Sequence, residues 1–288
     1  MVKAMVVMIM RRLDTAWALL AFLQQPDPVV QQLRPLLMEH GQFPTRRTWE
    51  RRLAALPPTL PGLIGRLGRH LVTLLNPWAQ QGHGAACDST MVRAHGGVWH
   101  KKEREAGIVP HSSIDTAAHW SKSGWHGWWY GWKLHLAVSV GSLWIALAAE
   151  FTVANVADSE VAPLLFTQLP AEVRYVLGDQ HYNTPELRTE CRRHNRELVA
   201  TRRGASPHPA SGVEVRRVFH HLRSQALEPF NGLFKNLFEW GGQMPVKGFR
   251  RCQLLALGAV VLYQLVLLYQ HHHHQPVGVS IKALLRAV

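Results

Sequence analysis

From Ala85 onward, hydrophobic residues occur in short runs that end at turn residues, a pattern typical of β-strands. These runs predict strands near residues 84–90, 131–140, 143–153, 173–178 and 197–202. Apolar residues at helical spacing predict helices at 158–168, 184–194, 222–238 and 252–270. Three successive strands followed by alternating helices and strands indicate an α/β fold with a mixed sheet and helices packed on it.

The first 80 residues have a helical pattern instead. Leu13, Trp17, Leu20 and Leu23 recur at spacings of three and four, and a second helix is expected after Pro44 and Thr45. We therefore expect a small N-terminal helical domain at residues 1–80 and a second domain at residues 81–288.

The stretch from Ala94 to Tyr130 is rich in His, Trp, Lys and Gly and poor in aliphatic residues. It predicts either an ordered active-site flap or a flexible loop, because long structureless loops are uncommon inside compact domains. The tryptophans in and next to it either stack on unpaired bases or form a local core. They are Trp120, Trp125, Trp128, Trp129 and Trp132.

The run from Leu254 to Tyr269 is almost entirely apolar and contains Gln264 near its middle. It is shorter than the roughly 20 apolar residues that a membrane-spanning helix needs. A buried C-terminal core helix is the favoured interpretation. A peripheral membrane protein, using this run together with the basic tail, is the alternative.

Charge and cysteine content narrow the class of protein. The chain has 288 residues and a formal net charge of +13, which favours a polyanionic partner such as nucleic acid or a membrane surface. Cys87, Cys191 and Cys252 are isolated, so neither a disulfide framework nor a thiolate zinc site is indicated. We expect a reducing, cytoplasmic compartment.

Three acidic residues are candidates for chemistry. Asp88 and Asp179 each end an apolar run, where a carboxylate projects at the rim of a sheet and is able to bind a hard cation. Glu228 lies on an amphipathic helix, beside the face marked by Leu227 and Phe230. Two aspartates and a glutamate that hold two Mg²⁺ ions form the arrangement that phosphoryl transfer on DNA needs.

The chain resembles the DDE transposases of bacterial and archaeal insertion sequences from about Cys87 to its C-terminus. The resemblance is to the group whose third carboxylate lies in a Tyr-x2-Arg-x3-Glu-x6-Lys signature. The segments that carry it are Asp88-Ser89-Thr90, Tyr130 to His135, Thr152 to Asp158, Gly178 to Tyr182 and Leu222 to Asn231. Relative to the signature, His221 stands at the Tyr position and Ser224 at the Arg position. Arg223 is one residue early, and Lys235 is in register.

The resemblance implies an RNase H-like catalytic core in which Asp88, Asp179 and Glu228 bind two Mg²⁺ ions. It also implies double-stranded DNA as substrate, at the element ends and at the target, and a homodimer on DNA. Arg223 and Lys235 are the expected phosphate contacts of the signature.

Other basic residues are candidates for DNA contact, and for several of them a role as ordinary surface residues is the alternative. Four arginines of the second predicted helix either contact DNA or form a solvated helix face; they are Arg46, Arg47, Arg51 and Arg52. Lys133 and His135 lie on a predicted strand and are either surface residues or DNA contacts. The Arg-rich stretch from Arg188 to Arg223 is a further source of phosphate contacts, and Arg250 and Arg251 join it at the start of the last apolar run.

The sequence therefore predicts a cytoplasmic, nucleoid-associated DNA transposase that cleaves the element ends and transfers the strands into target DNA. A catalytically inactive, DNA-binding remnant is the first alternative, because the signature is imperfect. The peripheral membrane protein is the second.

Overall fold

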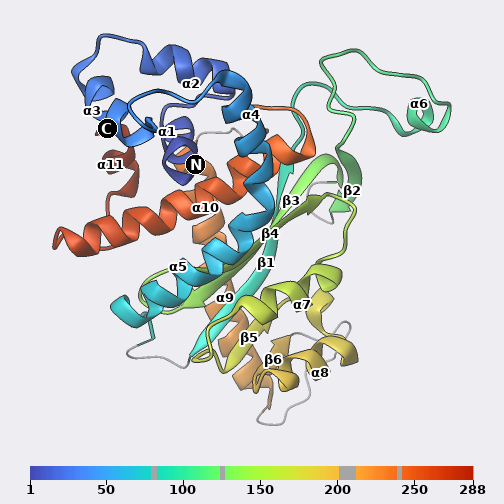
Figure 1. Ribbon diagram of the computed structural model, residues 1–288. Helices are drawn as coiled ribbons and strands as arrows, with labels where there is room; N and C mark the ends of the chain where they lie inside the picture. The colour runs from blue at the N-terminus through green and yellow to red at the C-terminus, as the bar shows by residue number, and fades with distance from the viewer. Residues whose placement is uncertain (79–82, 124–126, 201–211, 239–241, 288) are drawn as a thin grey trace.

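A single six-stranded sheet forms the centre of the computed structural model, which describes residues 1–78, 83–123, 127–200, 212–238 and 242–287 (Figure 1). Its strands run in the order β2-β3-β1-β5-β6. β4 pairs with the same edge of β3 as β2 does, further along that strand. The strands are β1 (Gly84–Arg93), β2 (His119–Ser123), β3 (Gly127–Val140), β4 (Ala146–Val153), β5 (Tyr175–Gly178) and β6 (Glu197–Ala200).

The sheet is mixed because its two halves are connected differently. β3 is antiparallel to both β1 and β4, and a short connection joins it to β4, whereas the chain between β1 and β3 contains α6 and β2. β5 and β6 are parallel to β1 and are reached through α7 (Asp158–Gln168) and α8 (Pro185–Arg193), since parallel strands need a crossover. The predicted order of strands and helices is therefore confirmed for β1 and from β3 to β6, whereas α6 and β2, which lie between β1 and β3, were not predicted.

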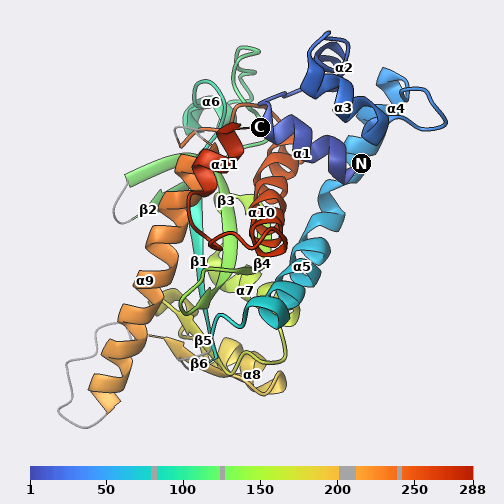
Figure 2. The same ribbon diagram turned by 90° about the vertical axis from the view of Figure 1, so that its left-hand side faces the viewer.

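Helices surround the sheet from both sides (Figure 2). The long α9 (Gly212–Phe238) contacts β1, β3, β5 and β6 and so crosses one face. α7 contacts β1, β3 and β4, and α5 (Leu60–Leu75) and α10 (Phe249–His272) pack against β4. The remaining elements are α1 (Val2–Met10), α2 (Ala16–Leu23), α3 (Pro28–Leu37), α4 (Arg46–Ala55), η1 (Pro57–Thr59), α6 (Lys101–Glu105), η2 (Gln180–Tyr182) and α11 (Ile281–Ala287).

The first 75 residues are helical, as predicted, but divided differently. One periodic segment was expected around Leu13 to Leu23, and the structure has α2 there, preceded by a separate α1. Thr15 caps α2 by accepting a hydrogen bond from the Ala18 backbone N–H. α4 begins after Thr45, as expected, and α3 and α5 were not predicted. α1 and α5 pack against α10, so these N-terminal helices share contacts with the C-terminal part of the chain.

The apolar C-terminal run lies inside the protein. α10 is the one helix in the described residues that is long and apolar enough to cross a membrane, and 83% of that apolar window is buried. Gln264 is fully buried, and its amide donates to the carbonyls of Ile64 on α5 and Ala146 on β4, at 2.9 and 2.8 Å. This burial is what the core-helix interpretation predicts.

The stretch from Ala94 to Tyr130 is partly regular. It contains α6, β2 and the start of β3, and the segment around α6 projects away from the sheet (Figure 1). Trp132 is fully buried against Phe151 and Phe249, and Trp129 is nearly so, which supports a local core at these positions. Trp128 is 63% exposed, and Trp125 lies outside the described residues.

Candidate active site

Asp88 lies on β1, and Asp179 directly follows the last residue of the neighbouring parallel strand β5. In the register of β1 and β5, Ala86 lies opposite Leu177, and each aspartate follows two residues later. Side chains two residues apart on a strand share a face. The negative charge of Asp179 accordingly contributes to raising the pKa of Asp88. The structure thus brings together the two aspartates that the sequence singled out.

The surroundings of Asp88 oppose its ionisation. Burial is the largest cause, and it raises the pKa of Asp88 to about 6. Arg223 of α9 counters this effect by donating from Nη1 to Asp88 Oδ2 at 3.2 Å, and the Ser89 backbone N–H donates to Oδ1 at 2.9 Å. The charges of Asp179 and Asp158 raise the pKa further. A positive charge next to Asp88 therefore stabilises the ionised form of its carboxyl group.

Tyr182 is a fully buried residue of the short helix η2 that begins after Asp179. Asp179 caps η2 by accepting from the His181 backbone N–H at 2.8 Å, and this turn places the Tyr182 ring in the core. A Cβ at Gly178 would lie 2.6 Å from Tyr182 Cβ, so only glycine fits there. Burial, together with the charges of the nearby acids, raises the pKa of Tyr182 well above its usual range. Its hydroxyl has no hydrogen-bond partner within the described residues.

The third predicted carboxylate is placed differently. Leu227, Phe230 and Phe234 of α9 are buried against the protein, as the amphipathic pattern predicts, and Glu228 is exposed. Arg223 and Glu228 are five residues apart, which separates them by about 140° around a helix. Arg223 faces Asp88, so Glu228 projects from another side of α9. Lys235, two turns further along, is half-buried, and burial lowers its pKa.

Lys133 and His135 lie on the opposite face of the sheet from Asp88. Ser89 pairs with His135 across β1 and β3, and consecutive residues of a strand point to opposite faces. α7 covers this face, which leaves Lys133 8% and His135 0% exposed. Both sequence-based interpretations, surface residue or DNA contact, require an exposure that neither side chain has. This burial corrects the expectation for both residues.

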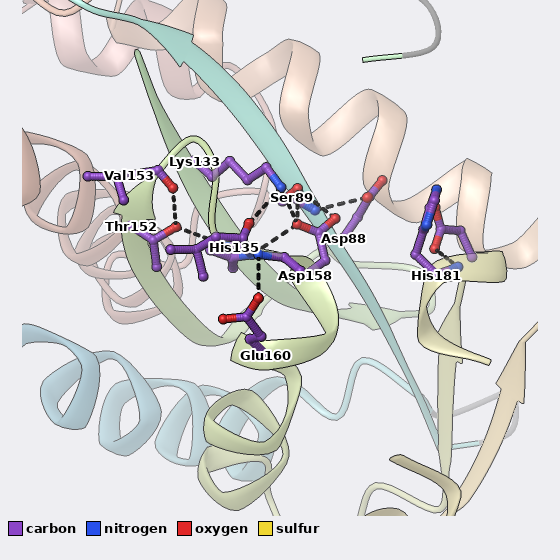
Figure 3. A network of polar contacts seen from close by, with 12 residues as sticks. Asp88, Ser89, Lys133, His135, Thr152, Val153, Asp158, Glu160 and His181 are labelled. Carbon is purple, nitrogen blue, oxygen red and sulfur yellow. Dashed lines mark hydrogen bonds and ion pairs between the residues drawn. The ribbon is translucent and has the colours of Figure 1, made fainter. Parts of the chain in front are cut away.

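One acidic residue of this region was missed as a site candidate. The sequence analysis names Asp158 only as the last residue of a segment that carries the family resemblance, yet Asp158 bonds Lys133 and Ser89 next to Asp88 (Figure 3). The local pattern reveals a helix start but not its partners, which come from β1 and β3. Lys133 and His135 are polar residues that alternate with apolar residues along the strand. This alternation was the sequence feature that indicates a charged partner on their face of the sheet.

The arginines predicted to contact DNA lie along α4 and at the start of α10. Arg47 and Arg51 are exposed, Arg46 pairs with Glu50 at 2.7 Å, and Arg52 pairs with Glu39. Arg46, Arg250 and Arg251 line a cleft of about 750 Å³ between the N-terminal helices and α10. Trp17, which is 63% exposed, lies on the same cleft. Part of the Arg-rich stretch, residues 201–211, lies outside the described residues.

Two of the three predicted carboxylates, those of Asp88 and Asp179, are suited to bind a metal ion. Mg²⁺ is commonly held by one or two carboxylates together with substrate phosphates and water. Asp88 and Asp179 fit that requirement as neighbouring hard oxygen donors whose charges repel each other. In the described parts of the chain, no three His, Cys, Asp or Glu side chains gather as a metal site.

The mixed sheet, with helices packed on it, fits the RNase H-like core of a DDE transposase, and so do Asp88 on β1 and Asp179 directly after β5. A comparison with family models agrees: the model described as "Transposase DDE domain" matches residues 80–225. The chain belongs to this family of transposases. No match was found among curated proteins or among solved structures. The matched residues include Asp88, Asp179 and Arg223 and end before Glu228.

Proposed function

We propose that this protein is an insertion-sequence transposase that cleaves DNA at the ends of its element and transfers the strands into target DNA. The observation that carries the proposal is the pair Asp88, on β1, and Asp179, directly after the adjacent parallel strand β5, both inside the family match. The family membership supplies the reaction class, and the paired carboxylates supply the chemistry that such a reaction needs.

In this proposal Asp88 and Asp179 hold Mg²⁺, with Glu228 as the third carboxylate. The metal ions, when bound, activate the attacking oxygen and stabilise the leaving one. Arg223 neutralises Asp88 in the structure, and it is close enough to the site to contact a DNA phosphate. The assignment of Glu228 and Lys235 rests on the signature of the group with Tyr-x2-Arg-x3-Glu-x6-Lys, since both lie beyond the matched residues.

Binding of double-stranded DNA is assigned to the basic surfaces. The exposed arginines of α4 and the cleft at Arg250 and Arg251 provide phosphate contacts that do not depend on sequence. A homodimer on DNA and a cytoplasmic, nucleoid-associated location complete the proposal.

The test is cleavage of DNA that carries the element's own ends, with Mg²⁺ supplied. Asp88→Asn, Asp179→Asn and Glu228→Gln should each abolish cleavage and leave DNA affinity nearly unchanged, because each keeps its shape and loses only its charge. Glu186→Gln, an exposed acid on α8, is the matched control and should cleave normally. Wild-type cleavage by either aspartate variant would refute the proposed site, and wild-type cleavage by Glu228→Gln would remove Glu228 from it.

A second candidate function is a DNA-binding remnant without catalysis. The observations that favour it are the exposed Glu228 and the ion pair that Arg223 makes with Asp88. The same assay separates the two functions. A remnant binds the element ends and leaves them uncut at every Mg²⁺ concentration.

A further inference from the structure

The strand that carries Asp88 is held from its other face. Asp88 points toward α9, where Arg223 meets it, and the next residue, Ser89, points toward α7. Ser89 thereby contacts both sides of the sheet. Its backbone N–H donates to Asp88 Oδ1 at 2.9 Å, and its hydroxyl lies 3.0 and 2.9 Å from the two carboxylate oxygens of Asp158 (Figure 3).

Asp158 is the centre of a buried polar network. Lys133 Nζ donates to Asp158 Oδ1 at 2.9 Å and to the Val156 carbonyl at the same distance. His135 Nδ1 lies 3.6 Å from Asp158 Oδ1, and its Nε2 lies 2.9 Å from the Thr152 hydroxyl (Figure 3). The Thr152 hydroxyl also bonds the Val153 carbonyl, so it accepts from His135 Nε2–H. Asp158 thus connects the first turn of α7 to β1 and β3.

Attaching a helix to a sheet through buried charged groups has a high cost in desolvation free energy. Removing two charges from water costs several kcal/mol per ion, and apolar side chains of similar size often attach elements at least as well. The Lys133 and Asp158 side chains are only 11% and 15% exposed. Charged, directional bonds add a fixed geometry. Here they fix Ser89, the residue next to Asp88.

We propose that Asp158 is a positioning residue for Asp88. By holding the Ser89 hydroxyl, it fixes the backbone of β1 at the point where the Ser89 N–H orients the Asp88 carboxylate. Lys133 balances the charge of Asp158, which lets the acid stay beside Asp88 in a buried site. The inference rests on the proposed function, because Asp88 acts there as a metal ligand.

The decisive comparison is Ser89→Ala with Ser89→Thr in the full-length protein. Alanine removes the hydroxyl that Asp158 holds, and threonine keeps it. Removing a partner that orients a metal ligand weakens metal binding about 10-fold or more. Ser89→Ala should therefore weaken Mn²⁺ binding by about that factor in calorimetry, and raise by a similar factor the Mg²⁺ concentration for half-maximal cleavage. Ser89→Thr should restore both, and DNA affinity should stay within about twofold of wild type in each variant, since phosphate contacts supply it.

Asp158→Asn tests the same link from the other side, and Glu160→Gln is its control. Glu160 lies in the same turn of α7 and carries the same charge, and within the described residues its carboxylate accepts only from the Ala157 backbone N–H, at 3.3 Å (Figure 3). Asp158→Asn should weaken Mn²⁺ binding as Ser89→Ala does, and Glu160→Gln should not. Should Asp158→Asn fail to fold, the pair of Ser89 variants still decides.

A purely structural role gives a different result. In that case Ser89→Ala and Asp158→Asn lower the melting temperature while Mn²⁺ affinity stays at the wild-type value, and the positioning role is overturned. Failure of the proposed function is recognised separately, because Asp88→Asn would then bind Mn²⁺ and cleave as the wild type does.

Discussion

At the scale of single residues, Asp88 combines a functional position with unfavourable surroundings. Its side chain is 28% exposed, and burial raises its pKa to about 6 in spite of the Arg223 ion pair. A carboxyl group has a pKa of about 3.9 in an unfolded chain. The folded protein therefore binds a proton at Asp88 more readily than the unfolded chain does. The contribution to stability is present below pH 4 and is lost as the pH rises through about 6.

Asp88→Asn should for this reason stabilise the protein at pH 7.5 while abolishing cleavage. One pKa unit corresponds to 1.36 kcal/mol, and partial exposure reduces the two-unit difference to about 1–2 kcal/mol. A gain of that size raises the melting temperature by about 2–6 °C in a chain of this length. The difference should vanish near pH 4, where Asp88 is protonated in the folded wild type. Thermal melts at the two pH values, with Glu186→Gln as control, check this, and a lower melting temperature for Asp88→Asn at pH 7.5 would contradict it.

At the scale of elements, the packing of α5 on β4 depends on a glycine. A Cβ at Gly68 would lie 2.8 Å from the Ala146 carbonyl oxygen and 3.0 Å from Leu147 Cα, both backbone atoms of β4. Only a glycine at position 68 therefore permits α5 to approach β4 this closely. Gly62, six residues earlier, is exposed, and a Cβ there would meet only the flexible side chain of Arg66, at 3.6 Å.

Gly68→Ala should destabilise the protein, and Gly62→Ala should not. The added methyl group at position 68 forces backbone to move, at a cost of about 1–3 kcal/mol. At position 62 the same change removes only the entropic penalty of glycine and should add about 0.5–1 kcal/mol. Urea unfolding of the two variants measures both effects. Equal stabilities would show that α5 does not contact β4 as closely as described.

At the scale of the whole molecule, the net charge of +13 favours contact with the phosphates of DNA. Arg250 and Arg251 begin the buried α10 and are exposed on the cleft beside α4. Phosphate contacts release counterions, so the affinity for DNA falls with salt in proportion to their number. This property separates residues that touch DNA from those that only add charge.

The double variant Arg250→Ala and Arg251→Ala should weaken binding to double-stranded DNA and reduce the slope of log affinity against log salt by about 1–2. A control that removes two exposed charges elsewhere, Lys3→Ala with Arg66→Ala, should change the slope little. Fluorescence anisotropy at several salt concentrations gives the slopes. Equal slopes for the two double variants would remove the cleft from the DNA-binding surface.

The sequence by itself determined the local elements and the two aspartates. The alternation and length of apolar runs placed β1, β3, β4, β5 and β6 within a few residues, because these patterns depend only on local periodicity. Asp88 and Asp179 were found for the same reason, since each ends such a run. β2 and α6 were missed because Ala94 to Tyr130 has no clear period.

Only the tertiary structure decided which side chains meet. Lys133 and His135 are buried because α7, which follows them by more than 20 residues, folds back over their face of the sheet. Arg223 reaches Asp88, and Glu228 does not share that side of α9, because the packing of Leu227, Phe230 and Phe234 sets the rotation of the helix. Local patterns identify the apolar face of an element, but the partner that covers each face is chosen by the whole core.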